Sequence, residues 1–173
     1  MNIMLINHYA GSPAMGMEYR PWYMAREWVK AGHNVTIIAA TYAHVRTIQP
    51  ETNKMFQEEI IDGITYLWVK TPPYRGNGAK RILNMFLFYR KLKCRARKLA
   101  LKYKPDAVIA SSTYPMDNYA AAKIAKISKA KHFYEVHDLW PLSPMELGGY
   151  KAGNPFIRYL QKAEDFAYKR TDG

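Results

Sequence analysis

The sequence predicts an α/β fold built on a mainly parallel β-sheet. Short apolar segments alternate with longer segments of helical periodicity along the whole chain, an order typical of strand–helix–strand units. Its 173 residues suffice for one domain with a substantial core, and 49% apolar content argues against a disordered chain. We therefore expect residues 1–173 to form a single domain.

The first strand–helix–strand unit spans the first forty residues. Residues 2–7 are mostly apolar and predict a short buried strand. Residues 18–31 predict a helix, with Pro21 in the first turn, where a missing N–H costs little. Gly32 ends this helix, and the β-branched run within residues 34–40 predicts the second strand. Short connections of this kind give right-handed parallel crossovers.

The middle of the chain contains a surface loop, a hairpin and a long helix. Residues 42–55 are polar and irregular, as expected of a loop. Residues 60–69 predict two strands around the turn Asp62-Gly63, a pair typical of tight hairpins. Helical periodicity then continues over residues 80–103.

The last third repeats the alternation. Residues 106–110 predict a buried strand, and residues 116–128 predict an alanine-rich helix. Residues 131–136 predict a further strand, and residues 156–169 a final helix. We find no internal repeat.

Two polar loops follow strands and should open onto the same edge of the sheet. The first, residues 7–17, contains Gly11, Ser12 and Gly16, and Arg20 follows in the next helix. Glycine lets backbone approach a ligand, and a helix N-terminus favours phosphate. An ordinary Gly/Pro connection explains this loop equally well. Its glycines do not fit the dinucleotide pattern, which disfavours a nicotinamide oxidoreductase.

The second loop begins with His137 and Asp138, directly after a predicted strand. Histidine changes charge near neutral pH, and a carboxylate can orient it or bind a sugar hydroxyl, so both are candidate catalytic residues. A structural histidine and a capping aspartate are the alternative. Glu135 falls within the predicted strand and is expected to meet a structural partner. Ser112 follows another strand and is a candidate ligand contact.

Other chemistry is not indicated. The five histidines lack ligand spacing, so no metal site is expected. No nucleophile–base pair is evident. The single cysteine, Cys94, cannot form an internal disulfide and suggests a reducing compartment. No secretory signal or apolar run of membrane-spanning length is visible.

The net charge of +12 is concentrated in the long predicted helix and its flanks. Residues 75–104 contain eleven Lys or Arg and no Asp or Glu. Basic side chains beside apolar ones on one helix face favour an anionic membrane surface. The expected membrane contacts are Leu87, Phe88, Lys91, Arg95, Lys98 and Lys102. A solvated face is the alternative; no nucleic-acid motif accompanies the charge, so nucleic acid is not expected as a partner.

Several segments, in this order, resemble the N-terminal domain of bacterial glycosyltransferase family 4 enzymes. The resemblance covers essentially the whole chain and is strongest for the last segment, which looks like a surface-polysaccharide or O-antigen branch. The matching segments are residues 1–3 and 7–9, 20–27, 32–37, 62–64, 104–106 and 135–141.

The resemblance implies the two-domain GT-B architecture, in which this chain is the Rossmann-like acceptor-side half. It implies transfer with retention, without a metal ion or other cofactor, from a sugar nucleotide to an acceptor that is often lipid-linked. Gly16 resembles the loop glycine near the donor phosphate, and His137 the histidine near the transferred sugar; Asp138, Gly11 and Ser12 are weaker matches.

We therefore expect half of a retaining glycosyltransferase of surface-polysaccharide synthesis, peripheral at the cytoplasmic face of the bacterial membrane. The C-terminal donor-binding domain is absent, so the isolated chain is expected to be inactive. The rival hypothesis is a non-enzymatic module that binds membrane or an acidic partner through helix 80–103.

Overall fold

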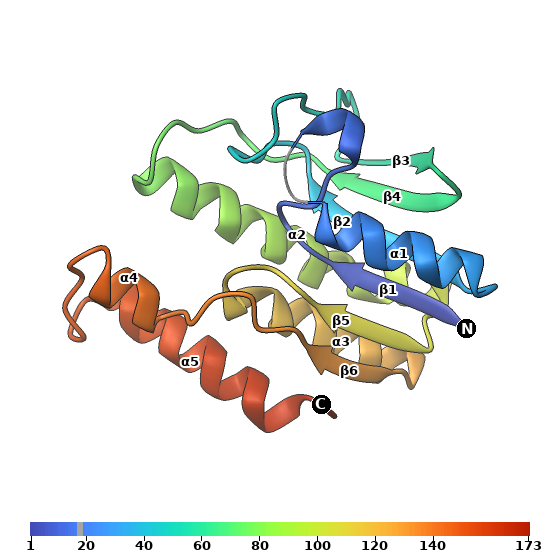
Figure 1. Ribbon diagram of the computed structural model, residues 1–173. Helices are drawn as coiled ribbons and strands as arrows, with labels where there is room; N and C mark the ends of the chain where they lie inside the picture. Colours follow the sequence, from blue (N-terminus) through green and yellow to red (C-terminus); the bar gives the residue numbers. More distant parts are fainter. Residues whose placement is uncertain (17–18) are drawn as a thin grey trace.

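The computed structural model describes residues 1–16 and 19–173. Its centre is a six-stranded sheet in the order β3-β4-β2-β1-β5-β6, shown in Figure 1. The strands are β1 (Asn2–Ile6), β2 (Asn34–Ala40), β3 (Phe56–Ile61), β4 (Ile64–Val69), β5 (Ala107–Ala110) and β6 (Lys131–Tyr134). All neighbouring pairs are parallel except β3 with β4, which confirms the predicted α/β fold.

The exception is the predicted hairpin. Asp62 and Gly63 both have positive φ, 53° and 79°, as a two-residue turn of the type I′ kind requires. Ile61 pairs with Ile64 across this turn. Strand β3 begins at Phe56, four residues before the predicted start, because its polar residues pair with β4 at the exposed edge of the sheet.

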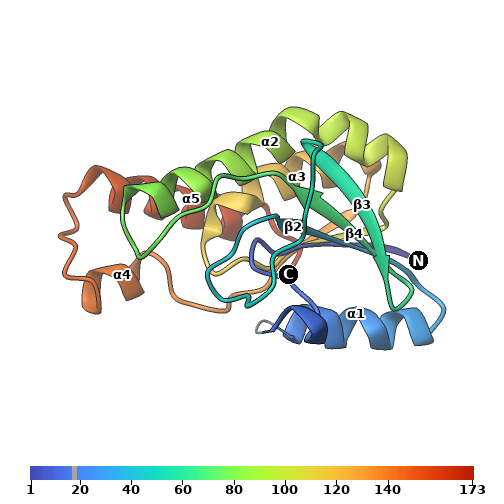
Figure 2. The ribbon, with the colours of Figure 1, turned by 90° about the horizontal axis from the view of Figure 1, so that it is seen from above.

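Helices cover both faces of the sheet. The helices are α1 (Arg20–Lys30), α2 (Ala79–Tyr103), α3 (Asn118–Ser128), α4 (Leu142–Glu146) and α5 (Pro155–Arg170), with single 3₁₀ turns at Pro13–Met15 and Pro115–Asp117. Figure 2 shows α1 on one face and α2 with α3 on the other. Helix α4 lies in a stretch predicted as loop, and the predicted helix start at Glu18 is outside the described residues.

The long basic helix α2 buries one stripe against the sheet. Phe88 and Leu92 on this stripe are fully buried and pack with Met4 and Val108 of the strands. The prediction that Phe88 contacts a membrane is therefore wrong. Phe88 falls three residues after the buried Met85, and i, i+3 positions share a helix face. Cys94, by contrast, is exposed.

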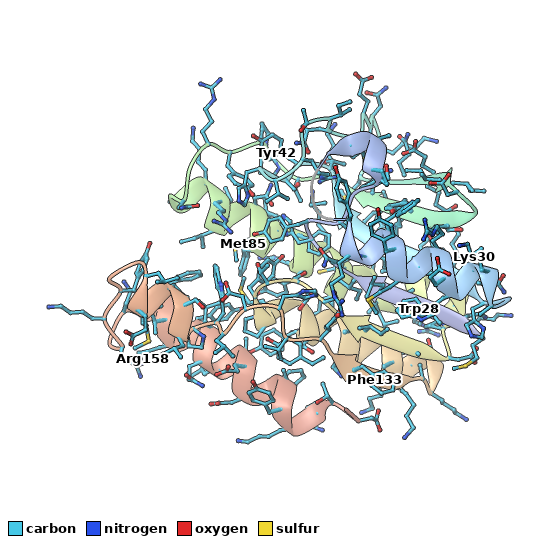
Figure 3. All side chains as sticks on the ribbon, viewed as in Figure 1. Trp28, Lys30, Tyr42, Met85, Phe133 and Arg158 are labelled. Carbon is cyan, nitrogen blue, oxygen red and sulfur yellow. The ribbon has the colours of Figure 1, made fainter. Side chains whose placement is uncertain are left out.

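The strand register aligns the carboxyl ends of β1, β5 and β6. Ile6 pairs with Ala110, and Ala110 pairs with Tyr134. The residues that follow these three strands therefore emerge at the same level of one edge. Figure 3 shows the two ends of the molecule: Tyr42 and Met85 lie toward this edge, and Lys30 lies at the opposite end.

Candidate functional site

The candidate site is a polar cluster centred on Glu135, the first residue after β6. Arg20, at the start of α1, donates from Nε and Nη2 to Oε1 of Glu135, with Nε at 2.9 Å. Ser111, the first residue after β5, donates from Oγ to Oε2 at 2.7 Å. Nε2 of His137 lies 3.2 Å from the same oxygen and 2.9 Å from Ser111 Oγ. Three separate parts of the chain thus meet at one carboxylate.

The cluster fixes the charge of its carboxylate. Hydrogen bonds, from His137 first and then from Ser111 and Arg20, lower the pKa of Glu135 to about 2, against the opposing effect of burial. An ionised carboxylate only accepts hydrogen bonds, so Nε2 of His137 carries its proton toward Glu135. The His137 side chain is only 18% exposed. Glu135 therefore acts as the residue that orients the imidazole at the rim of the sheet.

Asp138 accepts two hydrogen bonds from residues that follow it in the chain. Its Oδ2 accepts from Trp140 Nε1 at 2.8 Å, and its Oδ1 accepts from the hydroxyl of Ser143 in α4. It lines a cavity of about 300 Å³ between α2 and α4. Asp138 is therefore tied by hydrogen bonds to residues on the α4 side of its loop.

The loop after β1 is held against the loop after β5. Asn7 Nδ2 donates to the Ser111 carbonyl at 2.6 Å, and the His8 N–H donates to Ser112 Oγ at 3.0 Å. Ser112 and Ser12 are each only 1% exposed. Ser112 therefore holds the backbone of the first loop, and its side chain is closed off from solvent.

The two glycines of the first loop are required by packing. A Cβ on Gly11 would lie 2.9 Å from Cδ of Arg46, and a Cβ on Gly16 would lie 2.6 Å from Oγ1 of Thr47. Gly16 also has a φ of 92° and forms an isolated bridge with Arg46. The loop thus lies against the connection that follows β2, and only Gly16 of these two remains partly open at the surface.

We expect Gly16→Ala to destabilise the chain by about 2–6 kcal/mol. The backbone of Gly16, with φ 92° and ψ −141°, is one that essentially only glycine adopts and costs another residue ~1–3 kcal/mol. The overlap with Thr47 adds ~1–3 kcal/mol. Gly32→Ala is the matched control, because Gly32 has a similar φ of 84° but a Cβ there meets nothing within 4 Å. Urea unfolding measures both variants; equal losses would show that the contact with Thr47 adds nothing.

A second polar group at this edge was not anticipated from the sequence. Nη2 of Arg81 donates to the hydroxyl of Tyr9 at 3.2 Å, and Nδ1 of His44 lies 2.8 Å from the hydroxyl of Tyr74. Burial raises the pKa of Tyr74 to about 12, and burial followed by the charge of Arg81 lowers the pKa of His44. The sequence could have suggested only Tyr9, His44 and Tyr74, which lie in loops after strands, and not Arg81, which lies in α2.

The structure brings some of the predicted site residues together and separates others. Arg20 and His137 share the Glu135 cluster, with Gly16 in the segment that leads to Arg20. Gly11, Ser12 and Ser112 are buried, and Asp138 faces α4. Sequence reasoning missed Glu135 and Ser111 as members of the site. In the described ranges, 1–16 and 19–173, no group of three or more His, Cys, Asp or Glu could hold a metal ion.

The site lies where open α/β sheets generally bind ligands, outside the carboxyl ends of the strands. Comparison with curated proteins gives no match. Among solved structures, the C-terminal domain of a hydrogenase from Pyrococcus furiosus is 20% identical with a TM-score of 0.48, over 79% of this chain and 89% of that one; a likeness this low carries no argument. The model of Glycosyltransferase Family 4 matches residues 15–173, and the chain therefore belongs to glycosyltransferase family 4.

Proposed function

We propose that this chain is the acceptor-side half of a retaining glycosyltransferase. The enzyme would move a sugar from a sugar nucleotide to a lipid-linked glycan acceptor during cell-surface polysaccharide synthesis. The observation that carries the proposal is the convergence of Arg20, Glu135 and His137 at the carboxyl edge of the sheet in a family 4 chain. Family membership favours an enzyme over a module that only binds.

Each residue of the edge has a role in this proposal. His137, oriented by Glu135 and Ser111, contacts the transferred sugar. Gly16 lets the first loop approach the diphosphate of the donor. Arg20 is paired with Glu135, but its side chain is 59% exposed, and it contacts the same diphosphate. A second domain that these residues do not include supplies most of the charge stabilisation of the leaving diphosphate.

The cavity between α2 and α4 is the proposed acceptor site. It is lined by the aromatic residues Trp140, Tyr150 and Phe156 together with the polar Asp138 and Arg81. Aromatic faces with a few placed polar groups suit a sugar ring and its hydroxyls. The neighbouring Leu142 and Leu147 are 48% and 89% exposed, which suits the lipid portion of such an acceptor.

We also propose that the chain binds the anionic inner face of the membrane through α2. The contacts expected from the sequence need revision. Phe88 is buried, Lys91 donates to the carbonyl of Lys70, and Lys102 pairs with Glu58 at 2.9 Å. Leu87, Arg95 and Lys98 remain available. In the part of the chain that the structure describes, no helix is long and apolar enough to cross a bilayer.

The isolated chain should show no sugar transfer and no hydrolysis of sugar nucleotides. The donor-binding residues and the groups that stabilise the leaving diphosphate lie, in this proposal, in the second domain. Radiolabelled sugar nucleotides incubated with membrane extracts test this. The same chain joined to its second domain is the positive control, and its rate should survive EDTA. Appreciable turnover by the isolated chain would contradict the two-domain proposal.

A further inference from the structure

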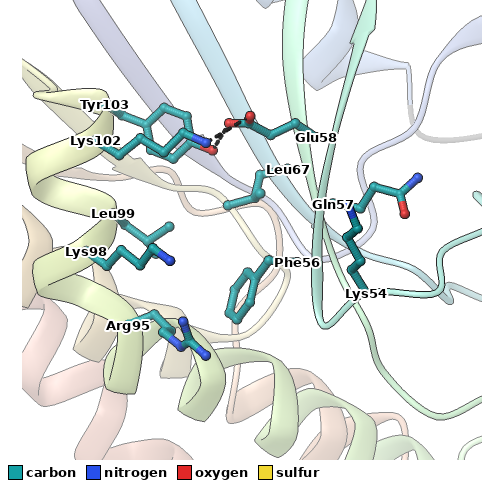
Figure 4. A pocket seen from close by; sticks show the side chains of 10 residues that line it. All are labelled: Lys54, Phe56, Gln57, Glu58, Leu67, Arg95, Lys98, Leu99, Lys102 and Tyr103. Carbon is teal, nitrogen blue, oxygen red and sulfur yellow. Dashed lines mark hydrogen bonds and ion pairs between the residues drawn. The ribbon is translucent and has the colours of Figure 1, made fainter.

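A groove of about 370 Å³ lies between α2 and the edge strand β3. Strands β3 and β6 form opposite edges of the sheet, so this groove is distant in the fold from the Glu135 cluster. Figure 4 shows side chains from α2 and β3 converging on it. Its lining residues are Lys54, Phe56, Gln57, Glu58, Leu67, Arg95, Lys98, Leu99, Lys102 and Tyr103.

One end of the groove is electrically neutral. Glu58 forms an ion pair with Lys102 at 2.9 Å and accepts a hydrogen bond from the hydroxyl of Tyr103. These hydrogen bonds, that from Tyr103 first, lower the pKa of Glu58. The Glu58 carboxylate is thus already paired with Lys102 and Tyr103, and it bounds this end of the groove.

The rest of the groove carries unbalanced positive charge. Arg95 and Lys98 both reach from α2 into the space beside Phe56 (Figure 4). The guanidinium of Arg95 lies 5.6 Å from the ring centre of Phe56. Across residues 1–16 and 19–173, no carboxylate forms an ion pair with Arg95 or Lys98. Two cations on neighbouring turns of one helix present paired donors to a single anion.

The surroundings of these cations are apolar. Leu67 and Leu99 form a buried floor, at 4% and 5% exposure. On the outer side of α2, Leu101 is 61% exposed and lies with Arg95 and Lys98 in an adjoining surface depression. The ligand that fits such a place carries an anion joined to a hydrophobic portion.

We infer that this groove binds the phosphate group of an anionic phospholipid, such as phosphatidylglycerol. Arg95 and Lys98 hold the phosphodiester, Phe56 contacts the glycerol backbone, and Leu101 faces the acyl chains. Free phosphate lacks the apolar portion that the floor and Leu101 would cover. The inference specifies the membrane contact proposed above for α2, and it is independent of sugar transfer.

A titration with monomeric lipid tests the groove separately from adsorption to a membrane. The ¹⁵N-labelled chain is titrated with dihexanoyl phosphatidylglycerol below its critical micelle concentration. Saturable shifts are expected at Phe56, Leu67 and Leu99. Inorganic phosphate and dihexanoyl phosphatidylcholine are the comparison probes, and both should bind at least about tenfold more weakly, one lacking the apolar part and the other the net charge.

Paired variants separate a specific site from general positive charge. Arg95→Gln with Lys98→Gln should raise the Kd for the short-chain lipid roughly thirtyfold, because each basic residue contributes about a factor of five or more at such a surface. Lys126→Gln with Lys129→Gln removes the same charge from exposed positions around the end of α3 and should change the Kd less than about twofold.

Three results would overturn the inference. Equal losses in the two double variants would show that only net charge matters. Phosphate binding as tightly as the lipid, at the same residues, would identify a free-anion site instead. Shifts that avoid Phe56, Leu67 and Leu99 would place the lipid elsewhere. Because no sugar is present, none of these results bears on whether the two-domain enzyme transfers one.

Discussion

Replacing His137 by alanine in the two-domain enzyme should lower kcat by about 10²–10³ with little change in KM for the donor. A positioned hydrogen-bonding group that acts on the transition state is worth ~2.7–4 kcal/mol. His137 is positioned in this way, because Glu135 Oε2 and Ser111 Oγ fix its Nε2 at 3.2 Å and 2.9 Å. Initial rates with a radiolabelled donor measure the effect.

His33→Ala is the matched control for this measurement. His33 lies just before β2, at the amino end of the sheet, where Nδ1 is 3.4 Å from the chain's terminal amine. It is far from the carboxyl edge and should leave kcat within about twofold, since surface changes away from a site have small effects. If His137→Ala and His33→Ala behave alike, the carboxyl edge is not where the sugar reacts.

Two buried groups should give opposite slopes of stability against pH. His8 is fully buried, and burial first, then Arg46 and Arg81, holds its pKa well below 6.5. Below pH 6.5, His8 is protonated in the unfolded chain and stays neutral in the folded chain. The folded state therefore loses stability as the pH falls. Burial raises the pKa of Asp117 to about 7. Between pH 3.8 and 7, the Asp117 carboxyl group is protonated in the folded chain and ionised in the unfolded chain. This group therefore makes the folded state more stable as the pH falls.

Single variants reveal each contribution. In the wild type the free energy of unfolding should fall between pH 7 and 5, because burial lowers the pKa of His44 and His132 as well as that of His8, and Asp117 opposes them. As the pH falls from 7 to 5, the free energy of unfolding of His8→Gln should rise relative to that of the wild type by about 2 kcal/mol. That of Asp117→Asn should fall relative to the wild type by a similar amount. Each group contributes ~1.4 kcal/mol per pH unit. Urea titrations at pH 7, 6 and 5 give these differences. Parallel curves for all three proteins would contradict the assignment.

The fold could be predicted because its strands and helices carry local signals. The run of β-branched and small residues in β2, and the Asp62-Gly63 turn, each specify one structure by their own chemistry. The parallel alignment then follows from the alternation of elements. Hence the sequence placed the first loop and His137 at one edge, and the structure confirms this.

The contacts within the site could not be predicted, because they join distant residues. Arg20 and Glu135 are separated by 115 positions, and no local pattern indicates that α1 begins beside the end of β6. Likewise, nothing in the local sequence indicates that Asp138 accepts hydrogen bonds from Trp140 and from Ser143 of α4. The prediction for Phe88 failed for a related reason: the basic stripe and the buried stripe of α2 are neighbours, and only packing decides between them.

The pKa of Glu135 tests most directly whether the loops after β1, β5 and β6 converge as described. Each of the three donors comes from a different segment, so a displaced loop would release the carboxylate. Side-chain ¹³C NMR across an acid titration should give a pKa of about 2, and Arg20→Gln and Ser111→Ala should each raise it. A value near the ordinary 4.5, unchanged in both variants, would contradict the convergence on which the proposed site depends.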